Sequence, residues 1–177
     1  MKGQAPFLFE IGCEEIPAGM LAAASRELKV ILEKHLQAER ILDGASVEVF
    51  ASPRRLAATC SGLRVRQEDI EREVTGPPRS VAFDAAGKPT RAAESFAAKQ
   101  GVPVAELYTV NSPRGECVAA RQRIVGRPAA DLLAEILPKA IGEISWPKTM
   151  YWTGITGARF IRPIRWIVAL LGRKTIR

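Results

Sequence analysis

The apolar and polar positions in the first part of the chain predict strands around one long helix. The apolar run at residues 6–12 ends at a glycine and predicts a strand. Apolar residues then recur at helical spacing over 17–40, where a proline suits the first turn because it has no backbone N–H to leave unpaired. Residues 46–52 and 56–63 predict two further strands, joined by a corner at a Ser-Pro-Arg-Arg sequence.

A boundary is predicted at Gly76-Pro77-Pro78, which follows the charged residues 66–75. The residue before a proline is pushed away from helical conformation, so two successive prolines favour a rigid turn or linker. We therefore expect two subdomains, residues 1–76 and residues 77–177.

The second subdomain mixes short elements of both kinds. Residues 80–83 predict a short strand, and Thr90 is a good N-cap for a helix that Gly101 ends. The other expected elements are a helical turn after Gly101, paired strands at 108–111 and 116–125, a helix that starts at Pro128 and ends or kinks at Pro138, and a buried strand over Trp166–Leu171.

These elements do not alternate as βαβ units, which predicts an α+β fold. We expect two small subdomains, each with short, mostly antiparallel strands and packed helices. Hydrophobic residues make up 47% of the chain and charged residues 25%, as in globular proteins with a core. No apolar run approaches the length of a membrane span, and the N-terminus lacks the apolar stretch of a signal peptide. A cytoplasmic location is the expectation.

The charge distribution changes this picture, because it singles out one segment. Residues 146–177 contain seven Lys/Arg and no Asp/Glu, which equals the net charge of +7 of the whole chain. All three tryptophans lie in the same segment. Cations that neutralise phosphates and rings that stack on bases are what a nucleic-acid surface needs. The alternative is that the rings belong to the core and the cations form a solvated face.

The residue types that carry catalysis are sparse. The chain has one histidine, His35, inside a helical pattern, and three cysteines that form no C-x-x-C pair. A Ser–His–Asp or Cys–His centre, a metal site and a phosphate-binding loop are therefore not expected. No catalytic residue is predicted in this chain.

Six cations are candidate contacts with an anionic partner. Arg54 and Arg55 leave a proline-fixed corner, and their planar guanidinium groups suit phosphates. A salt bridge to Glu48 or Glu14 is the equally open alternative. In the basic segment the candidates are Lys148, Arg159, Arg162 and Arg165.

Glu14 and Glu15 precede the long predicted helix. Negative charge is favourable at a helix N-terminus, which accounts for both carboxylates structurally. A contact with a partner subunit is the functional alternative. The basic segment has a similar alternative, namely internal pairing with acids of the first part of the chain.

Several local motifs occur in one order along almost the whole chain. They are FLFEIGCEEIPA at 7–18, VEVFASPRRLA at 47–57, TGPPRSVAFDAAGKPTRAAESFAAKQG at 75–101, GEC at 115–117, VGRPAADLL at 125–133, SWPKTMYW at 145–152 and RFIRPIRWIVALLG at 159–172. Together they resemble the amino-terminal region of the beta subunit of the bacterial-type, two-subunit glycyl-tRNA synthetase.

The resemblance implies an accessory role in ATP-dependent attachment of glycine to its tRNA. In that family the alpha subunit carries the catalytic core, where ATP and Mg²⁺ are expected, so this chain is expected to hold no cofactor. The implied partners are the alpha subunit and tRNA(Gly), within an alpha2beta2 tetramer. A general nucleic-acid-binding module and a purely structural assembly domain remain the alternatives.

Overall fold

The chain forms two compact units in the computed structural model, which describes residues 3–177 apart from residues 85, 114, 153, 155, 156 and 158. Unit 1 combines Met1–Gln67 with Arg127–Arg177, and unit 2 is Glu68–Gly126. This grouping differs from the predicted division at residue 76, because the last fifty or so residues return to the first unit instead of joining the second. The α+β class and the antiparallel strand pairing are confirmed.

Unit 1 is built on a five-stranded antiparallel sheet with the strand order β10-β9-β1-β3-β2. The central strand β1 pairs with β3 on one side and with β9 on the other. The strand predicted over Trp166–Leu171 is therefore present, but it completes the sheet of the first unit. The strands are β1 (Gln4–Cys13), β2 (Glu48–Ser52), β3 (Arg55–Arg64), β9 (Ile164–Leu171) and β10 (Lys174–Thr175).

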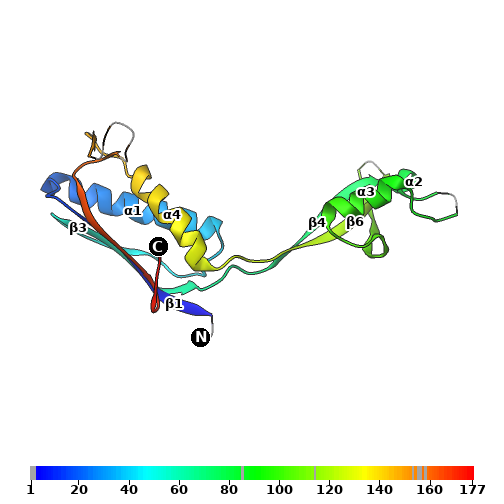
Figure 1. The fold of residues 1–177 in the computed structure, drawn as a ribbon, viewed down its shortest axis with the longest axis horizontal. Coiled ribbons are helices and arrows are strands. Elements are labelled where there is room, and N and C mark those ends of the chain that lie inside the picture. Colours follow the sequence, from blue (N-terminus) through cyan, green and yellow to red (C-terminus); the bar gives the residue numbers. More distant parts are fainter. Residues whose placement is uncertain (1–2, 85, 114, 153, 155–156, 158) are drawn as a thin grey trace. The chain divides into compact units, whose positions relative to one another are not determined.

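Two helices, α1 (Ala18–Ala38) and α4 (Ala129–Glu143), cover one face of this sheet (Figure 1). Alternate residues of β1 point towards them, and Phe9 and Ile11 are fully buried. The apolar stripe of α1 meets this face through Leu28, Leu32 and Leu36. The apolar spacing seen in the sequence therefore identified the buried face of α1.

Helix α4 continues past Pro138, so the helix does not end at that residue, which was one of the two expected outcomes. Its predicted buried positions, among them Leu133 and Leu137, are confirmed. Pro138 lies on the exposed side of the helix, where water can hydrogen-bond the carbonyl that the proline leaves without a donor. Ala140 and Ile141 are buried, so packing against the core holds the last turn in place.

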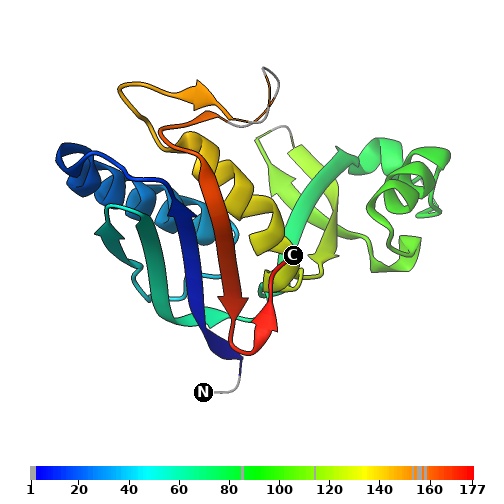
Figure 2. The same cartoon turned by 60° about the vertical axis from the view of Figure 1, so that its left-hand side comes forward.

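Among the described residues of unit 1, no helix lies on the opposite face of the sheet, as Figure 2 shows. Trp166 lies on this face and keeps 41% of its surface exposed. The expectation of a fully buried strand is thus wrong for Trp166–Leu171, of which only Ala169 and Leu171, near the end of β9, are buried. Alternation accounts for the exposed Trp166, since a sheet covered on one side buries every second residue. Ile167 is in register with the buried Ile11 but is 52% exposed, so the helices do not cover the beginning of β9.

A two-stranded sheet, β7 (Met150–Tyr151) with β8 (Arg159–Phe160), precedes β9 in unit 1. Phe160 is buried and meets the Trp146 ring edge-on, with ring centroids 5.1 Å apart. The indole N–H of Trp152 donates to the Phe160 carbonyl at 3.0 Å. Two of the three tryptophans therefore support this segment.

Unit 2 is a three-stranded antiparallel sheet, β4-β6-β5, with short helices and a small cluster around Ala82, Ala93 and Val118. The cap at Thr90 is confirmed by a 3.2 Å bond from the Ala92 N–H, and Gly101 ends the helix with a φ of 70°. Its elements are β4 (Ile70–Pro78), α2 (Arg79–Ala82), α3 (Arg91–Gln100), a 3-10 turn (Val104–Glu106), β5 (Tyr108–Ser112) and β6 (Gly115–Ile124).

Two predictions for unit 2 are wrong. Residues expected as a strand at 80–83 form the helical turn α2, because Thr90 hydrogen-bonds the carbonyls of Val81 and Ala82 and holds that turn closed. Gly76-Pro77-Pro78 is the end of β4 and not a break between domains. A Cβ atom at Gly76 would lie 2.8 Å from the Phe96 ring, so close packing explains the glycine.

Candidate functional site

Three segments that are distant in the sequence meet at one end of the five-stranded sheet. They are the end of β1, the turn between β2 and β3, and the beginning of β9. The antiparallel register places Gly12 opposite Arg55 on one side and opposite Trp166 on the other. Six of the eight residues that the sequence singled out lie at this end of the sheet or next to it, namely Glu14, Glu15, Arg54, Arg55, Arg162 and Arg165. We call this region the sheet-end site.

Backbone hydrogen bonds hold the segment after β1 between two proline-containing segments. The Cys13 N–H donates to the Arg54 carbonyl at 3.0 Å, and the Ile16 N–H donates to the Pro53 carbonyl at 2.6 Å. The Glu14 N–H donates to the Pro163 carbonyl at 3.0 Å. These bonds connect the motifs at 7–18, 47–57 and 159–172, which the sequence showed only as separate pieces.

The acidic pair after β1 contacts the arginines before and within β9. Arg165 Nε lies 2.9 Å from Glu14 Oε1, and Arg162 Nε donates to the Glu15 carbonyl at 2.8 Å. Burial, followed by the nearby Glu14 charge, raises the pKa of the Cys13 thiol, which favours the neutral form. These contacts agree with internal pairing to the acidic first part of the chain, the alternative left open by the sequence.

Glu10 connects three adjacent strands on the open face of the sheet. Its Oε1 atom accepts a hydrogen bond from the Trp166 indole N–H at 2.7 Å and lies 3.5 Å from Arg55 Nε. The Glu10 side chain is only 17% exposed, whereas the Arg55 side chain is 55% exposed. Arg55 is thus paired with Glu10, and not with the Glu48 or Glu14 that the sequence suggested.

Gly12 leaves the space that the Trp166 indole occupies. A Cβ atom at Gly12 would lie 1.9 Å from Cε2 of the indole and 2.2 Å from Cδ2, far inside contact distance. The ring therefore covers the Gly12 backbone, and the bond to Glu10 fixes its nitrogen edge. Only glycine permits this arrangement on β1.

A hollow of ≈ 290 Å³ opens beside Trp166, between the ends of β2 and β3. Phe50, Ser52, Arg54 and Arg55 line it together with the indole. Phe50 is 59% exposed, and Arg54 is exposed with no ion pair or side-chain hydrogen bond to any residue that the structure describes. The arrangement offers two aromatic rings and an available guanidinium group.

Two of the predicted cations lie elsewhere in unit 1. Arg159 is on β8, where its guanidinium carbon lies 5.3 Å from the centre of the Tyr151 ring. Lys148 is exposed just before β7, and its side chain makes no hydrogen bond or ion pair with the described part of the chain. Neither belongs to the sheet-end site, so the six cations do not form one cluster.

Sequence reasoning missed Glu10, Gly12 and Phe50, and it treated Trp166 as core. Glu10 had a signal, since it is the only acid in an apolar strand and alternates with Phe9 and Ile11. The partners of Gly12 and Phe50 depend on strand order, which the sequence does not show.

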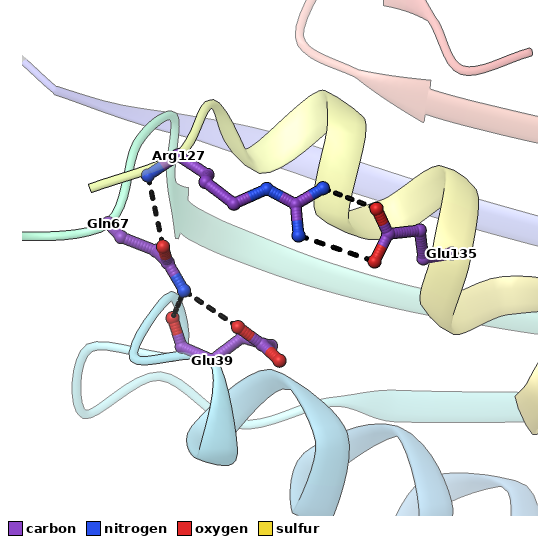
Figure 3. Close-up of polar contacts among 4 residues, drawn as sticks. All are labelled: Glu39, Gln67, Arg127 and Glu135. Carbon is purple, nitrogen blue, oxygen red and sulfur yellow. Dashed lines mark hydrogen bonds and ion pairs between the residues drawn. The ribbon is translucent and has the colours of Figure 1, made fainter. Parts of the chain in front are cut away.

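A second polar cluster lies where the chain leaves unit 1 and returns to it (Figure 3). The Gln67 side-chain amide donates to the Glu39 carbonyl at 3.0 Å and to its carboxylate at 2.7 Å, and accepts from the Arg127 N–H at 3.0 Å. Arg127 also pairs with Glu135, and this hydrogen bond lowers the pKa of the Glu135 carboxyl. Each of the four residues in this cluster has a hydrogen-bond or ion-pair partner within the cluster, which indicates a structural role.

None of the helices in the described part of the chain is long and apolar enough to cross a membrane. Among the same residues, no three His, Cys, Asp or Glu side chains are grouped so as to hold a metal ion.

Comparison with known proteins gives one consistent family. A family model described as "Glycyl-tRNA synthetase beta subunit" matches residues 7–177. The glycine–tRNA ligase beta subunit of Acidobacterium capsulatum is 49% identical over 173 residues, which is 97% of this chain and 24% of that protein. The subunits of Geobacter metallireducens and Oleidesulfovibrio alaskensis are 50% and 39% identical and are covered over 23% and 24% of their lengths. The chain thus spans about a quarter of the relatives it matches.

Proposed function

Because this chain belongs to the glycyl-tRNA synthetase beta subunit family, we propose that it is a non-catalytic accessory region of a glycine–tRNA ligase. It contributes to tRNA binding and to subunit assembly. The overall reaction is the ATP-dependent attachment of glycine to tRNA(Gly) in the cytoplasm, with ATP and Mg²⁺ bound by the alpha subunit of an alpha2beta2 enzyme. The match over residues 7–177 is the observation that carries this proposal.

The sheet-end site supports the tRNA-binding part. Arg54 projects from a turn that two backbone bonds fix to the segment after β1, so its position is defined by the fold. An exposed guanidinium that has no hydrogen-bond or ion-pair partner among the described residues is available for a phosphate, to which it can donate paired hydrogen bonds. Arg55, Arg162 and Arg165 already contact Glu10, Glu15 and Glu14, and we assign them to holding the site together.

The acidic pair and the remaining cations support the assembly part. Glu15 is exposed beside the beginning of α1, and Lys148 and Arg159 are exposed on the β7–β8 segment. Exposed charged groups of both signs suit contacts with a partner subunit, where complementary charge directs association.

The tRNA-binding part is tested with the Arg54→Ala variant of the intact subunit assembled with its alpha subunit. A shift assay with tRNA(Gly) at several salt concentrations should show weaker binding, and the slope against salt should fall by about one phosphate contact. The double variant Arg54→Ala with Arg55→Ala should weaken binding further, because it also removes the contact with Glu10 that helps to hold the site together. Arg26→Ala, an exposed arginine on α1, is the matched control and should leave binding unchanged.

The rival functions give different results in the same assay. Equal binding of tRNA(Gly) and an unrelated tRNA, each lowered by Arg54→Ala, would favour a general nucleic-acid-binding module. An unchanged salt slope in the variant would reject a phosphate contact at Arg54. Co-purification of the alpha subunit with the Glu15→Lys and Lys148→Glu variants tests assembly, and undiminished recovery with both would reject that part of the proposal.

A further inference from the structure

We propose that the hollow beside Trp166 binds one unstacked nucleobase of single-stranded RNA, with the adjoining phosphate held by Arg54. This inference rests on the proposed role in tRNA binding and specifies the part of the RNA that the sheet-end site contacts. The base is held between the ring of Phe50 and the indole of Trp166.

The two aromatic rings are exposed to solvent on the face of the sheet that lies opposite the helices. Phe50 and Trp166 keep 59% and 41% of their surfaces exposed, although large apolar side chains normally bury most of theirs. Both line the same hollow. Proteins recognise unpaired bases of RNA by stacking them on such rings, because every base has a flat π face.

The indole is fixed before any ligand arrives. One face covers Gly12, and the nitrogen edge donates to Glu10 at 2.7 Å. A ring that is already positioned loses little conformational entropy on binding, which favours affinity. Its only hydrogen-bond donor is also occupied, so the ring can stack on a base but cannot read its edge. We therefore expect stacking with little preference among the four bases.

The cations beside the rings complete a site for a nucleotide. Arg55 is partly compensated by Glu10 at 3.5 Å, whereas Arg54 has no such partner among the described residues. A nucleotide carries a flat ring and an anionic phosphate a short distance apart. The hollow presents the complementary pair, namely aromatic faces and one uncompensated guanidinium.

The size of the hollow limits what it can hold. Its volume of ≈ 290 Å³ is just below the ~300–1,000 Å³ usual for small-molecule pockets. A single base can enter such a space, whereas a paired and stacked base must first be extruded from its helix at an energetic cost. The expected ligand is thus a loop, a bulge or a single-stranded end.

The test measures binding of a fluorescein-labelled hexaribonucleotide of mixed sequence to the intact protein by anisotropy. Phe50→Ala should weaken binding by about 5- to 150-fold, the range for removal of one stacked base. Val30→Ala is the matched control, since Val30 is a 63% exposed apolar residue on α1, and it should leave binding unchanged. Phe50 is exposed, so the thermal midpoint of the variant should equal that of the wild type.

A second probe separates the base from the phosphate. An abasic oligomer of the same length should bind the wild-type protein as weakly as the hexaribonucleotide binds Phe50→Ala. A duplex of the same sequence should also bind weakly. Arg54→Ala should lower the salt slope for both the hexaribonucleotide and the abasic oligomer.

Equal binding of abasic and complete oligomers, or an unchanged affinity in Phe50→Ala, would overturn the inference. The proposed function would then survive if Arg54→Ala still weakened tRNA(Gly) binding in the assembled enzyme. Loss of the alpha subunit from Phe50→Ala, with oligomer binding unchanged, would show that a protein surface occupies the hollow and would likewise overturn it.

Discussion

At the scale of single residues, side chains on the open face of the sheet are held in position by residues of neighbouring strands. Glu10 on β1 holds Trp166 on β9 and Arg55 on β3 through the same carboxylate oxygen. Gly12, two residues further along β1, provides the room for the indole. The position of each side chain therefore depends on a residue in another strand.

This dependence predicts the effect of Gly12→Ala. The added Cβ atom overlaps the indole, and overpacking of this kind costs about 1–3 kcal/mol in the free energy of unfolding. Gly12 does not have a positive φ, so the backbone itself accepts alanine. In the Trp166→Ala background the space is free, and the same substitution should cost close to nothing.

Urea unfolding of the four proteins in this double-mutant cycle measures the coupling between the two positions. Tryptophan fluorescence cannot follow all four equally, so far-UV circular dichroism is the appropriate signal. Equal costs of Gly12→Ala in both backgrounds would show that the indole does not occupy this space.

Single residues also show where sequence reasoning stops. The pattern of the chain singled out the cations and the acidic pair, because charged residues and proline-containing corners can be recognised from the sequence alone. It did not identify Gly12 or Phe50, whose roles come from the register between strands. Trp166 was treated as core, since nothing in the sequence says that only one face of the sheet is covered by helices.

At the scale of elements, the strongly periodic or capped segments were predicted, whereas β4 and α2 were not. The long helix α1, the helix capped by Thr90 and the β2–β3 corner follow from local spacing and turn chemistry. The strand β4 was missed because its charged residues are exposed on both faces. Helix α2 was taken for a strand because four residues do not establish a period, and tertiary hydrogen bonds decide its conformation.

The junction between elements at Gln67 predicts a clear loss of stability. Gln67 is a buried polar residue of unit 1 and joins the end of α1 to the beginning of α4 through three hydrogen bonds (Figure 3). Gln67→Leu leaves the Arg127 N–H without its acceptor, which should lower the free energy of unfolding by about 1–3 kcal/mol.

Tryptophan fluorescence during urea unfolding measures this change in unit 1, because all three tryptophans lie in that unit. Gln4→Leu is the matched control, since Gln4 makes one exposed hydrogen bond to Asp43, and its cost should stay within about 0.5 kcal/mol. A cost for Gln67→Leu as small as that of the control would contradict the role assigned to the cluster.

At the scale of the whole molecule, unit 2 is an insertion into unit 1. The chain leaves at Gln67 and returns at Arg127, and these two residues are joined by a backbone hydrogen bond of 3.0 Å. The sequence suggested a boundary by its prolines, but a discontinuous unit has no local signal. The unit forms because β9 pairs with β1 across more than 150 residues and because α4 packs into the core of unit 1.

This topology predicts that unit 1 folds without unit 2. The larger core cluster lies entirely in unit 1 and the smaller one entirely in unit 2, so removing Glu68–Gly126 deletes no side chain from the larger core. Gln67 and Arg127 face each other as strand partners do, so an Asn-Gly turn can connect them. The shortened protein should unfold cooperatively in urea, with a tryptophan fluorescence midpoint close to that of the intact chain.

The isolated Glu68–Gly126 segment, whose buried apolar cluster is small, should be marginally stable at best. A broad, non-cooperative transition of the shortened protein would show that unit 1 depends on the insertion, and the independence of the two units would then be rejected.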